Sequence, residues 1–205
     1  MGDRVEKESL TRSDRVGLLL VIAGGVIAAG VTLVVSVVRI AEIVTNRDVP
    51  VRAPFVDTPA QLPVGPDGAA VTVLVDEATV RVSDMAGITV ASLVIAQVAL
   101  AVTVVLVVAC GYLLCRNLMR GIAFSRTNSR LITVCSGVIL FGWFATTMFG
   151  NMGINGAFAA LSEHTYDNAR FGINWTPCFV ALALAVVAVA FQTGERLQRD
   201  TEGLV

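Results

Sequence analysis

The chain has 205 residues, of which 55% are hydrophobic and only 15% are charged, and its mean hydropathy is +0.76. Because soluble domains have about 25% charged residues, this composition argues against a soluble domain and is typical of a membrane protein. The net charge of −1 and the isoelectric point near 5.8 argue against nucleic acid as a partner, since binding to phosphates requires a basic surface.

Four stretches are long and apolar enough to cross a membrane, which requires about 20 residues of helix. We predict spans at residues 17–44, 87–114, 131–152 and 174–193. They separate an N-terminal tail (1–16), an outer segment (45–86), a link (115–130), an outer loop (153–173) and a C-terminal tail (194–205). The expected fold class is all-α transmembrane, a four-helix multi-pass bundle with a small extracytoplasmic β-hairpin between its first two helices.

The first span follows a basic tail that contains Arg4, Lys7, Arg12 and Arg15. Its apolar run is longer than the core of a signal peptide, which has about 7 to 15 residues, so we expect a retained helix. Gly25 and Ala29 are small residues four positions apart, a spacing that favours close helix packing.

The outer segment 45–86 begins with a proline-rich half that we expect to be extended or looped. Its second half contains two runs of alternating β-branched residues, 71–75 and 78–82, which predict a β-hairpin that turns at Asp76 and Glu77. Because this pair is not a favoured turn sequence, the register stays open. The hairpin is either a structural cap or a surface that docks a partner or senses a ligand.

The link 115–130 contains Arg116, Arg120, Arg126 and Arg130. Apolar residues lie between these arginines, a pattern that suits the headgroups of an anionic cytoplasmic leaflet or contact with a partner. The ordinary excess of basic residues on the cytoplasmic side explains the same pattern without any regulatory role.

Glycine recurs near the end of the third span at Gly150, Gly153 and Gly156. We expect helix packing, at Gly150 and Gly153 above all, and the end of the helix in this region. The alternative is an interrupted helix of the kind that forms transporter sites, with Asn151, Asn155, Gln97 and Thr103 around a water-filled path. The apolar cores of the spans lack Asp, Glu, Lys, Arg and His, which argues against coupling to ions or protons.

The sequence predicts no catalytic residue, no metal site and no cofactor. His164 is the only histidine, and its neighbours Ser162, Glu163 and Asp167 are adjacent in sequence, which does not make a catalytic triad. The four cysteines, Cys110, Cys115, Cys135 and Cys178, have no metal-binding spacing. Because they lie in apolar segments, we expect buried thiols rather than disulfides.

Charge asymmetry predicts that both termini are cytoplasmic. The two tails and the link together carry ten basic residues, whereas the opposite face, with Arg39 and Glu42 at the end of the first span included, carries five basic and nine acidic residues. Lys7 is the only lysine, and with the abundance of Ala, Val and Gly this indicates the plasma membrane of a high-GC bacterium.

A set of residues in the second half of the chain carries a resemblance to a known family. The set is Gly121, Phe124, Ser125 and Asn128 in the link, and Gly194, Glu195, Arg196 and Leu197 in the tail. With the third and fourth spans, these residues resemble a bacterial family of four-helix membrane proteins, the domain of unknown function two-nine-seven-five. The resemblance implies four helices with an extracytoplasmic insert, and it suggests a regulatory partner because members are often encoded beside a helix-turn-helix regulator.

The favoured function is therefore that of a non-enzymatic accessory or regulatory membrane protein that associates with a membrane or cytoplasmic partner. A homo-oligomer would satisfy the same features, and the lipid bilayer with its anionic cytoplasmic leaflet is a partner in either case. The alternative is a small transporter or channel subunit, and a membrane enzyme is third.

Overall fold

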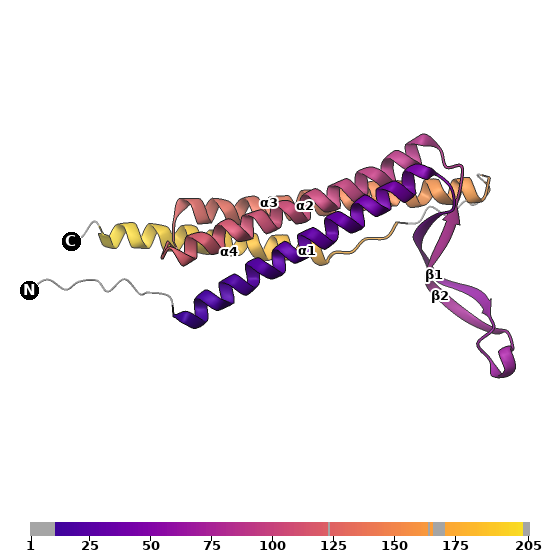
Figure 1. Cartoon of the computed structure of the whole chain (residues 1–205), viewed down its shortest axis with the longest axis horizontal. Helices are drawn as coiled ribbons and strands as arrows, with labels where there is room; N and C mark the ends of the chain where they lie inside the picture. The colour runs from indigo at the N-terminus through magenta and orange to yellow at the C-terminus, as the bar shows by residue number, and fades with distance from the viewer. Residues whose placement is uncertain (1–10, 123, 164, 166–170, 203–205) are drawn as a thin grey trace, which may run out of the picture. The chain divides into compact units, whose positions relative to one another are not determined.

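The computed structural model describes residues 11–122, 124–163, 165 and 171–202. These residues form four long helices and one two-stranded sheet (Figure 1). In chain order the elements are α1 (Arg12–Thr45), β1 (Val49–Leu62), a short 3-10 helix (Pro66–Gly68), β2 (Val71–Val82), α2 (Gly87–Met119), α3 (Arg126–Leu161) and α4 (Thr176–Glu202). All four helices are long and apolar enough to cross a membrane, as the sequence predicts.

The elements form two compact units. Unit 1 contains the first part of α1, the second part of α2, the link, the first part of α3 and all of α4. Unit 2 consists of residues 37–98 and 145–174, so it contains the hairpin and the adjoining parts of α1, α2 and α3.

The start of α1 is set by a reciprocal cap. The Asp14 backbone N–H donates to the Thr11 hydroxyl oxygen (3.2 Å), and the Thr11 backbone N–H donates to the Asp14 carboxylate (3.1 Å). This arrangement satisfies two backbone donors that the first helical turn would leave unpaired. The helix therefore begins before the apolar stretch does.

The helices of unit 1 present apolar side chains on their outer surface. Leu20 is 67% exposed, Phe141 is 74% exposed and Val186 is 70% exposed. Apolar patches larger than a few hundred Å² are rare on soluble monomers, because each exposed Å² costs about 25 cal/mol in water. In a lipid bilayer these side chains would contact acyl chains, and the free-energy cost of exposing them to water would not arise.

Small residues bring the helices of unit 1 close together. The Gly25 Cα faces Val108 on α2, and a methyl group on Gly25 would lie 3.4 Å from that side chain. Gly142 on α3 faces the side chain of Thr103 with no room for a methyl group. The Ser136 hydroxyl donates to the Ala181 carbonyl of α4 (2.7 Å). Such contacts are the usual source of helix association in lipid, where apolar burial gives no net gain.

Unit 2 has its own apolar core, formed by Ile43, Val49, Val51, Val82, Met85 and Ala157. These residues come from α1, from both strands, from the turn before α2 and from α3. Through this core, the base of the hairpin packs against the ends of three helices.

The sheet is an antiparallel hairpin, but its strands differ from the predicted ones. Residues 71–82 form one continuous strand, β2, and the proline-rich segment 49–62 is its partner, β1. The prediction of a turn at Asp76 and Glu77 is wrong. Proline is tolerated here because both strands of a two-stranded ribbon are edges, so the missing N–H can face outward.

The turn lies at Gly65–Gly68 instead. Asp67 (φ 54°) and Gly68 (φ 78°) adopt left-handed backbone conformations, and the Gly68 N–H donates to the Gly65 carbonyl (3.0 Å). Glycine and aspartate suit such turns, because glycine has no steric penalty at positive φ and aspartate tolerates it better than most residues.

Helix α3 continues past the glycines at which the sequence predicted its end. It runs without a break from Arg126 to Leu161, so part of the predicted outer loop 153–173 is helical. The segment that follows the glycines, from Ala157 to Leu161, is apolar, and Ala157 is buried in the core of unit 2. This packing extends the helix beyond the point where local propensity favours its end.

We expect Gly142→Ala to destabilise the protein and Gly137→Ala, on the same helix, to leave it unchanged or slightly more stable. A methyl group at position 142 overlaps the Thr103 side chain, whereas the space beside Gly137 is open. Overpacking costs about 1–3 kcal/mol, while relief of a helical glycine gains about 0.5–1 kcal/mol. Thermal unfolding in mild detergent measures both, and equal melting temperatures for the two variants would contradict the packing described.

Candidate functional site

The hairpin divides into a half that is packed and a half that is exposed. Its register shifts between Pro54 and Thr58, so β1 has two more residues than β2 at this point. A bulge of this kind bends a strand and increases its twist. We call the part before the shift, Val49–Pro54 with Glu77–Val82, the proximal half, and the part after it, Thr58–Leu62 with Val71–Val75 and the turn between them, the distal half.

The proximal half is fastened to the helices of unit 2. Val49, Val51 and Val82 are each at most 4% exposed. At the bend, the Phe55 ring meets the Phe158 ring of α3 edge to face, with centroids 5.6 Å apart. Aromatic contacts of this geometry add about 0.5–1.5 kcal/mol to the burial itself.

A side-chain amide closes the base of the hairpin. The Asn46 side-chain NH₂ donates to the Met85 carbonyl (2.9 Å), and the Met85 N–H donates to the Asn46 side-chain oxygen (2.9 Å). Asn46 has a φ of 50°, a conformation that asparagine tolerates better than most residues. This pair of bonds joins the end of α1 to the segment that leads into α2.

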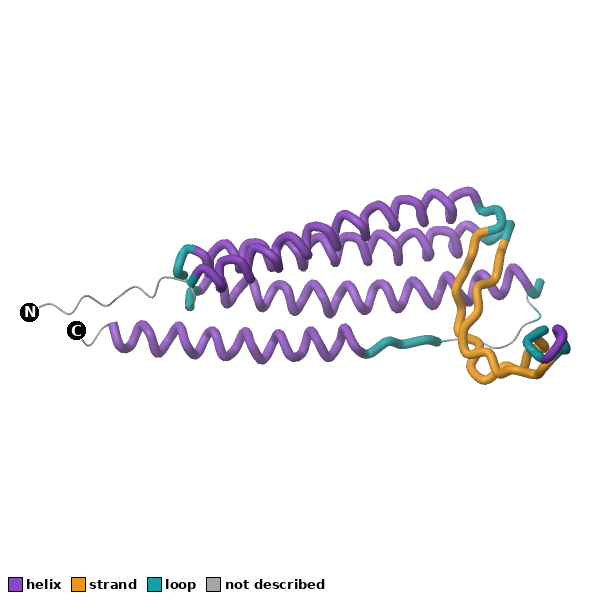
Figure 2. The backbone as a smooth tube through the Cα atoms, turned by 60° about the horizontal axis from the view of Figure 1, so that its bottom comes forward, coloured by secondary structure: helices purple, strands orange, loops and turns teal. Residues whose placement is uncertain are grey.

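The distal half leaves four large apolar side chains on the surface. Leu62 is 42% exposed, Val64 65%, Val71 41% and Leu74 65%. The ribbon runs away from the helical part of unit 2 to one side (Figure 2). Between Thr58 and Val75 the only charged residue is Asp67, in the turn.

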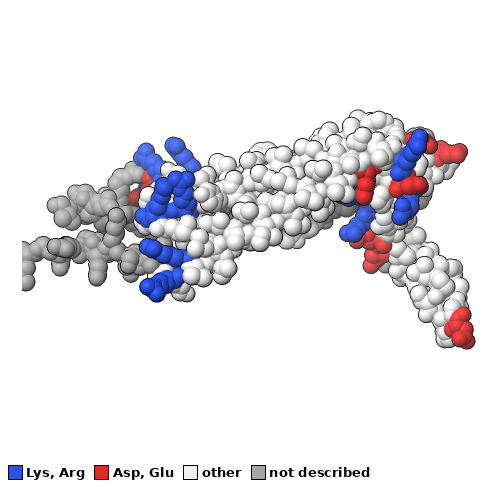
Figure 3. Space-filling view, in the orientation of Figure 1, with Lys and Arg blue, Asp and Glu red and all other residues white. Residues whose placement is uncertain are grey.

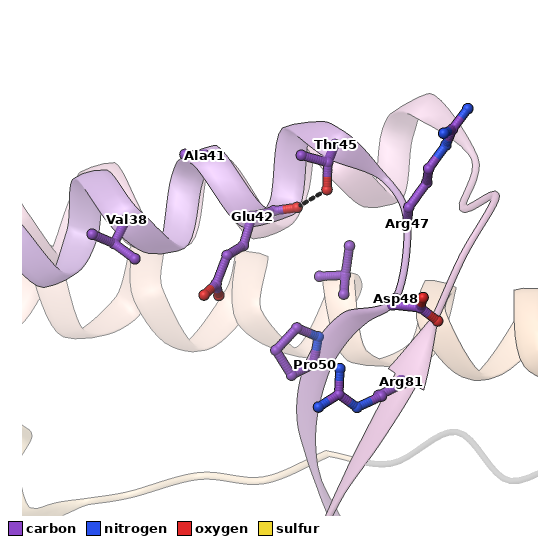
Figure 4. A pocket seen from close by; sticks show the side chains of 9 residues that line it. Val38, Ala41, Glu42, Thr45, Arg47, Asp48, Pro50 and Arg81 are labelled. Carbon is purple, nitrogen blue, oxygen red and sulfur yellow. Dashed lines mark hydrogen bonds between the residues drawn. The ribbon is translucent and has the colours of Figure 1, made fainter.

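A groove of about 600 Å³ lies at the hairpin base. Figure 4 shows Glu42 projecting from α1, with Asp48, Pro50 and Arg81 on the hairpin side. Glu42 pairs with Arg39 (2.5 Å), and Arg39 also donates to the Pro50 carbonyl (2.8 Å). The Thr45 hydroxyl donates to the Glu42 carbonyl (2.6 Å), so this hydroxyl is held by its own helix and is not aligned with a base.

A second groove, of about 510 Å³, lies in unit 2 between α2 and α3 and contains Asn151 and Asn155. The Asn151 amide is already engaged, because its NH₂ donates to the Thr147 and Gly172 carbonyls (2.8 and 3.0 Å) and its oxygen accepts from the Gly172 N–H (2.9 Å). Asn151 is 6% exposed. Its role is to hold the segment before α4 against α3.

The other two residues of the predicted water-filled path differ from Asn151 in their surroundings. Gln97 is half-buried on the part of α2 that belongs to unit 2. Thr103 lies in unit 1, where its hydroxyl donates to the Ala99 carbonyl of its own helix (2.7 Å) and its side chain packs on Gly142.

In unit 1 the link between α2 and α3 is held by backbone caps. Gly121 (φ 75°) follows the end of α2, where its N–H donates to the Leu118 carbonyl (2.9 Å) and the Ile122 N–H donates to the Asn117 carbonyl (3.0 Å). These two bonds form a Schellman motif, which ends a helix on a left-handed glycine. Ser125 then caps α3, since its hydroxyl oxygen accepts the Asn128 N–H (3.2 Å).

Asn128 is the centre of the link and is completely buried. Its side-chain NH₂ donates to the Ile122 carbonyl (2.7 Å), and its oxygen accepts from the Asn117 side-chain NH₂ (2.7 Å). The amide therefore joins the last turn of α2, the connecting residues and the first turn of α3.

The link is also attached to α4. The Phe124 ring packs on Phe191 with centroids 5.3 Å apart, and its edge fills the space that a side chain at Gly194 would need. Arg126 pairs with Glu195 (3.2 Å). Of the residues that carry the resemblance, Phe124 in the link is thus in contact with Gly194 in the tail, and Ser125 is bonded to Asn128.

Basic side chains gather at this end of unit 1. They are Arg12, Arg15, Arg116, Arg120, Arg126, Arg130 and Arg196, all exposed. Figure 3 shows, on the face in view, blue side chains gathered beside the white surface of the apolar helices. In unit 1 the only described acidic side chains are Asp14 and Glu195. The four arginines predicted to contact headgroups or a partner belong to this cluster.

The residues predicted for helix packing have different surroundings. Gly25 and Ala29 are half-buried on α1, and Gly25 faces Val108. Gly153 lies directly against the Leu93 side chain of α2, whereas the space beside Gly150 is open. Gly156, the third glycine of this series, also lies directly against a side chain of α2, that of Thr89.

Sequence reasoning missed the exposed distal half because it placed the turn at the wrong pair of residues. The run Gly65-Pro66-Asp67-Gly68 is a stronger turn signal, since proline and glycine suit the backbone angles that a turn requires. With the turn placed there, Leu62 and Leu74 would have been assigned to facing strands.

No group of three or more His, Cys, Asp or Glu side chains that could hold a metal occurs within the described part of the chain. His164 lies outside the described residues.

Searches with protein-family models, among curated proteins and among solved structures find no match to this chain. The resemblance to the four-helix family of unknown function stays a prediction.

We expect Asn128→Ala to lower the stability of the protein by about 1–3 kcal/mol, because it removes a buried amide and the hydrogen bonds that this amide makes to the Asn117 side chain and the Ile122 carbonyl. The neighbouring exposed Thr127→Ala is the matched control and should change stability little. Thermal unfolding in detergent measures both effects. In a double-mutant cycle, Asn117→Ala and Asn128→Ala should be non-additive, and simple additivity would show that the two amides act independently.

Proposed function

We propose that this chain is a non-enzymatic accessory or regulatory protein of a bacterial plasma membrane that acts by binding another protein chain through the distal half of its hairpin. The observation that carries the proposal is the exposure of Leu62, Val64, Val71 and Leu74 on a ribbon whose base is rigidly packed. A two-stranded ribbon is marginal in water by itself. Burial of these side chains against a partner would stabilise it.

The proposed orientation places the basic end of unit 1 in the cytoplasm and the hairpin outside. Its support is the segregation of charge among the side chains that the structure describes. Unit 1 has seven arginines and two acidic residues, whereas unit 2 has seven acidic residues, among them Asp67, Asp76, Glu77 and Asp84, and four arginines. Arginine resists translocation across a membrane. In this orientation Arg116, Arg120, Arg126 and Arg130 contact anionic headgroups, each contributing about 1 kcal/mol.

A small transporter or channel subunit is the second candidate, favoured by the groove that contains Asn151 and Asn155. The hydrogen bonds of Asn151 argue against this candidate, because both N–H groups of its side-chain amide already donate to carbonyls of the protein. A membrane enzyme is the third candidate, and no described constellation of residues favours it.

The orientation predicts the labelling of engineered cysteines. On intact cells, a membrane-impermeant maleimide should label Asp67→Cys, and it should label Arg120→Cys only after the membrane is opened. The wild-type protein is the control for its four native cysteines, all of which lie in helices. Labelling of Arg120→Cys from outside would reverse the assignment.

The proposed association predicts that the distal half governs co-purification. A tagged chain extracted in mild detergent should retain a bound protein, and Leu62→Asn with Leu74→Asn should reduce the yield of that protein at least tenfold. Both side chains are on the surface, so folding should be preserved. The control is Ile122→Asn with Leu197→Asn, which changes two exposed apolar side chains that lie outside the predicted spans and far from the hairpin in sequence.

If the distal and control variants retained the partner equally, the hairpin would not be the binding surface. Recovery of the chain alone, together with solute flux in liposomes, would favour the transporter instead.

A further inference from the structure

The two edges of the hairpin differ in their ability to bind another strand. Strand β1 lacks a backbone N–H at three positions, Pro50, Pro54 and Pro59. Strand β2 contains no proline from Val71 to Val82. Among the described residues β2 pairs only with β1, so its outer edge is unpaired. An unpaired strand edge is a template for a further strand, and prolines protect against such pairing. The available edge is therefore that of β2.

The distal part of β2 is suited to pairing with an identical strand. The run from Val71 to Val75 has no charge and is rich in β-branched residues. In an antiparallel pair centred on Val73, Val71 lies opposite Val75 of the second copy and Thr72 lies opposite Leu74. Cross-strand pairs of this kind stabilise sheets.

Charge disfavours registers that are centred farther along β2, at Asp76 or Glu77. A pair centred on Asp76 or Glu77 would place two identical carboxylates directly opposite each other, which is destabilising. With the centre at Val73, Asp76 lies opposite Ala70 and Glu77 lies opposite Ala69 of the second copy, so no like charges meet.

We infer that a second copy of this chain binds the outer edge of β2 in an antiparallel pair centred on Val73, which gives a four-stranded sheet across a twofold axis. The inference rests on the proposed function and names the partner. Two copies in one membrane have the same orientation, so a twofold axis along the membrane normal relates them and closes the assembly as a dimer. The sideways course of the ribbon carries β2 beyond the helical part of unit 2 (Figure 2).

Cysteine cross-linking tests the register. Residues at the centre of an antiparallel pair have Cα atoms about 4.5–5.5 Å apart, which permits a disulfide. Mild oxidation of native membranes should convert most of a Val73→Cys variant to a dimer. Thr79→Cys on the same strand is the control, because its two copies would lie about 40 Å apart at about 3.3 Å per residue. The wild-type chain controls for the native cysteines.

Charge exchange tests whether this contact governs association. Val73→Lys and Val73→Glu should each reduce co-purification of two differently tagged copies at least tenfold, and co-expression of the two variants should restore it. Restoration shows that both variants fold.

Three results would overturn the inference: no dimer with Val73→Cys, an equal dimer with Thr79→Cys, or association unaffected by either charge at position 73. If instead a different protein co-purified in a manner that depended on Leu62 and Leu74, the proposed function would stand while the self-pairing would be wrong.

Discussion

The chain reverses direction between long apolar helices, and at each reversal the backbone polar groups lose their helical partners and need others. Three asparagine amides meet this need. Asn46 joins the end of α1 to Met85 before α2, and Asn151 joins α3 to Gly172. In unit 1, Asn128 joins α2, the link and α3. A side-chain amide suits this role because it donates and accepts at once, like a peptide group.

The amide at Asn46 also explains how the hairpin can be both structural and exposed. Because this amide and the core around Val49 and Val82 fix the proximal half, the distal half does not need to pack on the helices in order to be held. The bend next to Phe55 marks the change between the two parts. A rigid base reduces the entropy lost when an exposed ribbon binds a partner, which is the physical advantage of such a design for association.

Unit 1 achieves close packing by a different means. In lipid the helices gain nothing from burying apolar surface, so contact depends on small residues such as Gly25 and Gly142 and on the Ser136 hydroxyl. The link adds the aromatic contact of Phe124 with α4, which Gly194 permits. Most of the residues that carry the resemblance to a four-helix family therefore hold the link in place in this structure. They do so by packing and by capping helix ends.

The sequence by itself determined the number of helices, the presence of a hairpin and the segregation of charge, because length, apolarity and net charge are properties of single segments. It did not determine which strands pair, since the prolines of β1 argue against a strand until a partner for β2 is known. The continuation of α3 past Gly156 likewise depends on Ala157 reaching the core of unit 2. The positions of Asn46, Asn128 and Asn151 are plain in the sequence, but their partners lie 39, 11 and 21 residues away along the chain. Only the tertiary structure decided these contacts, because a hydrogen bond between distant segments depends on their approach in space and leaves no local pattern.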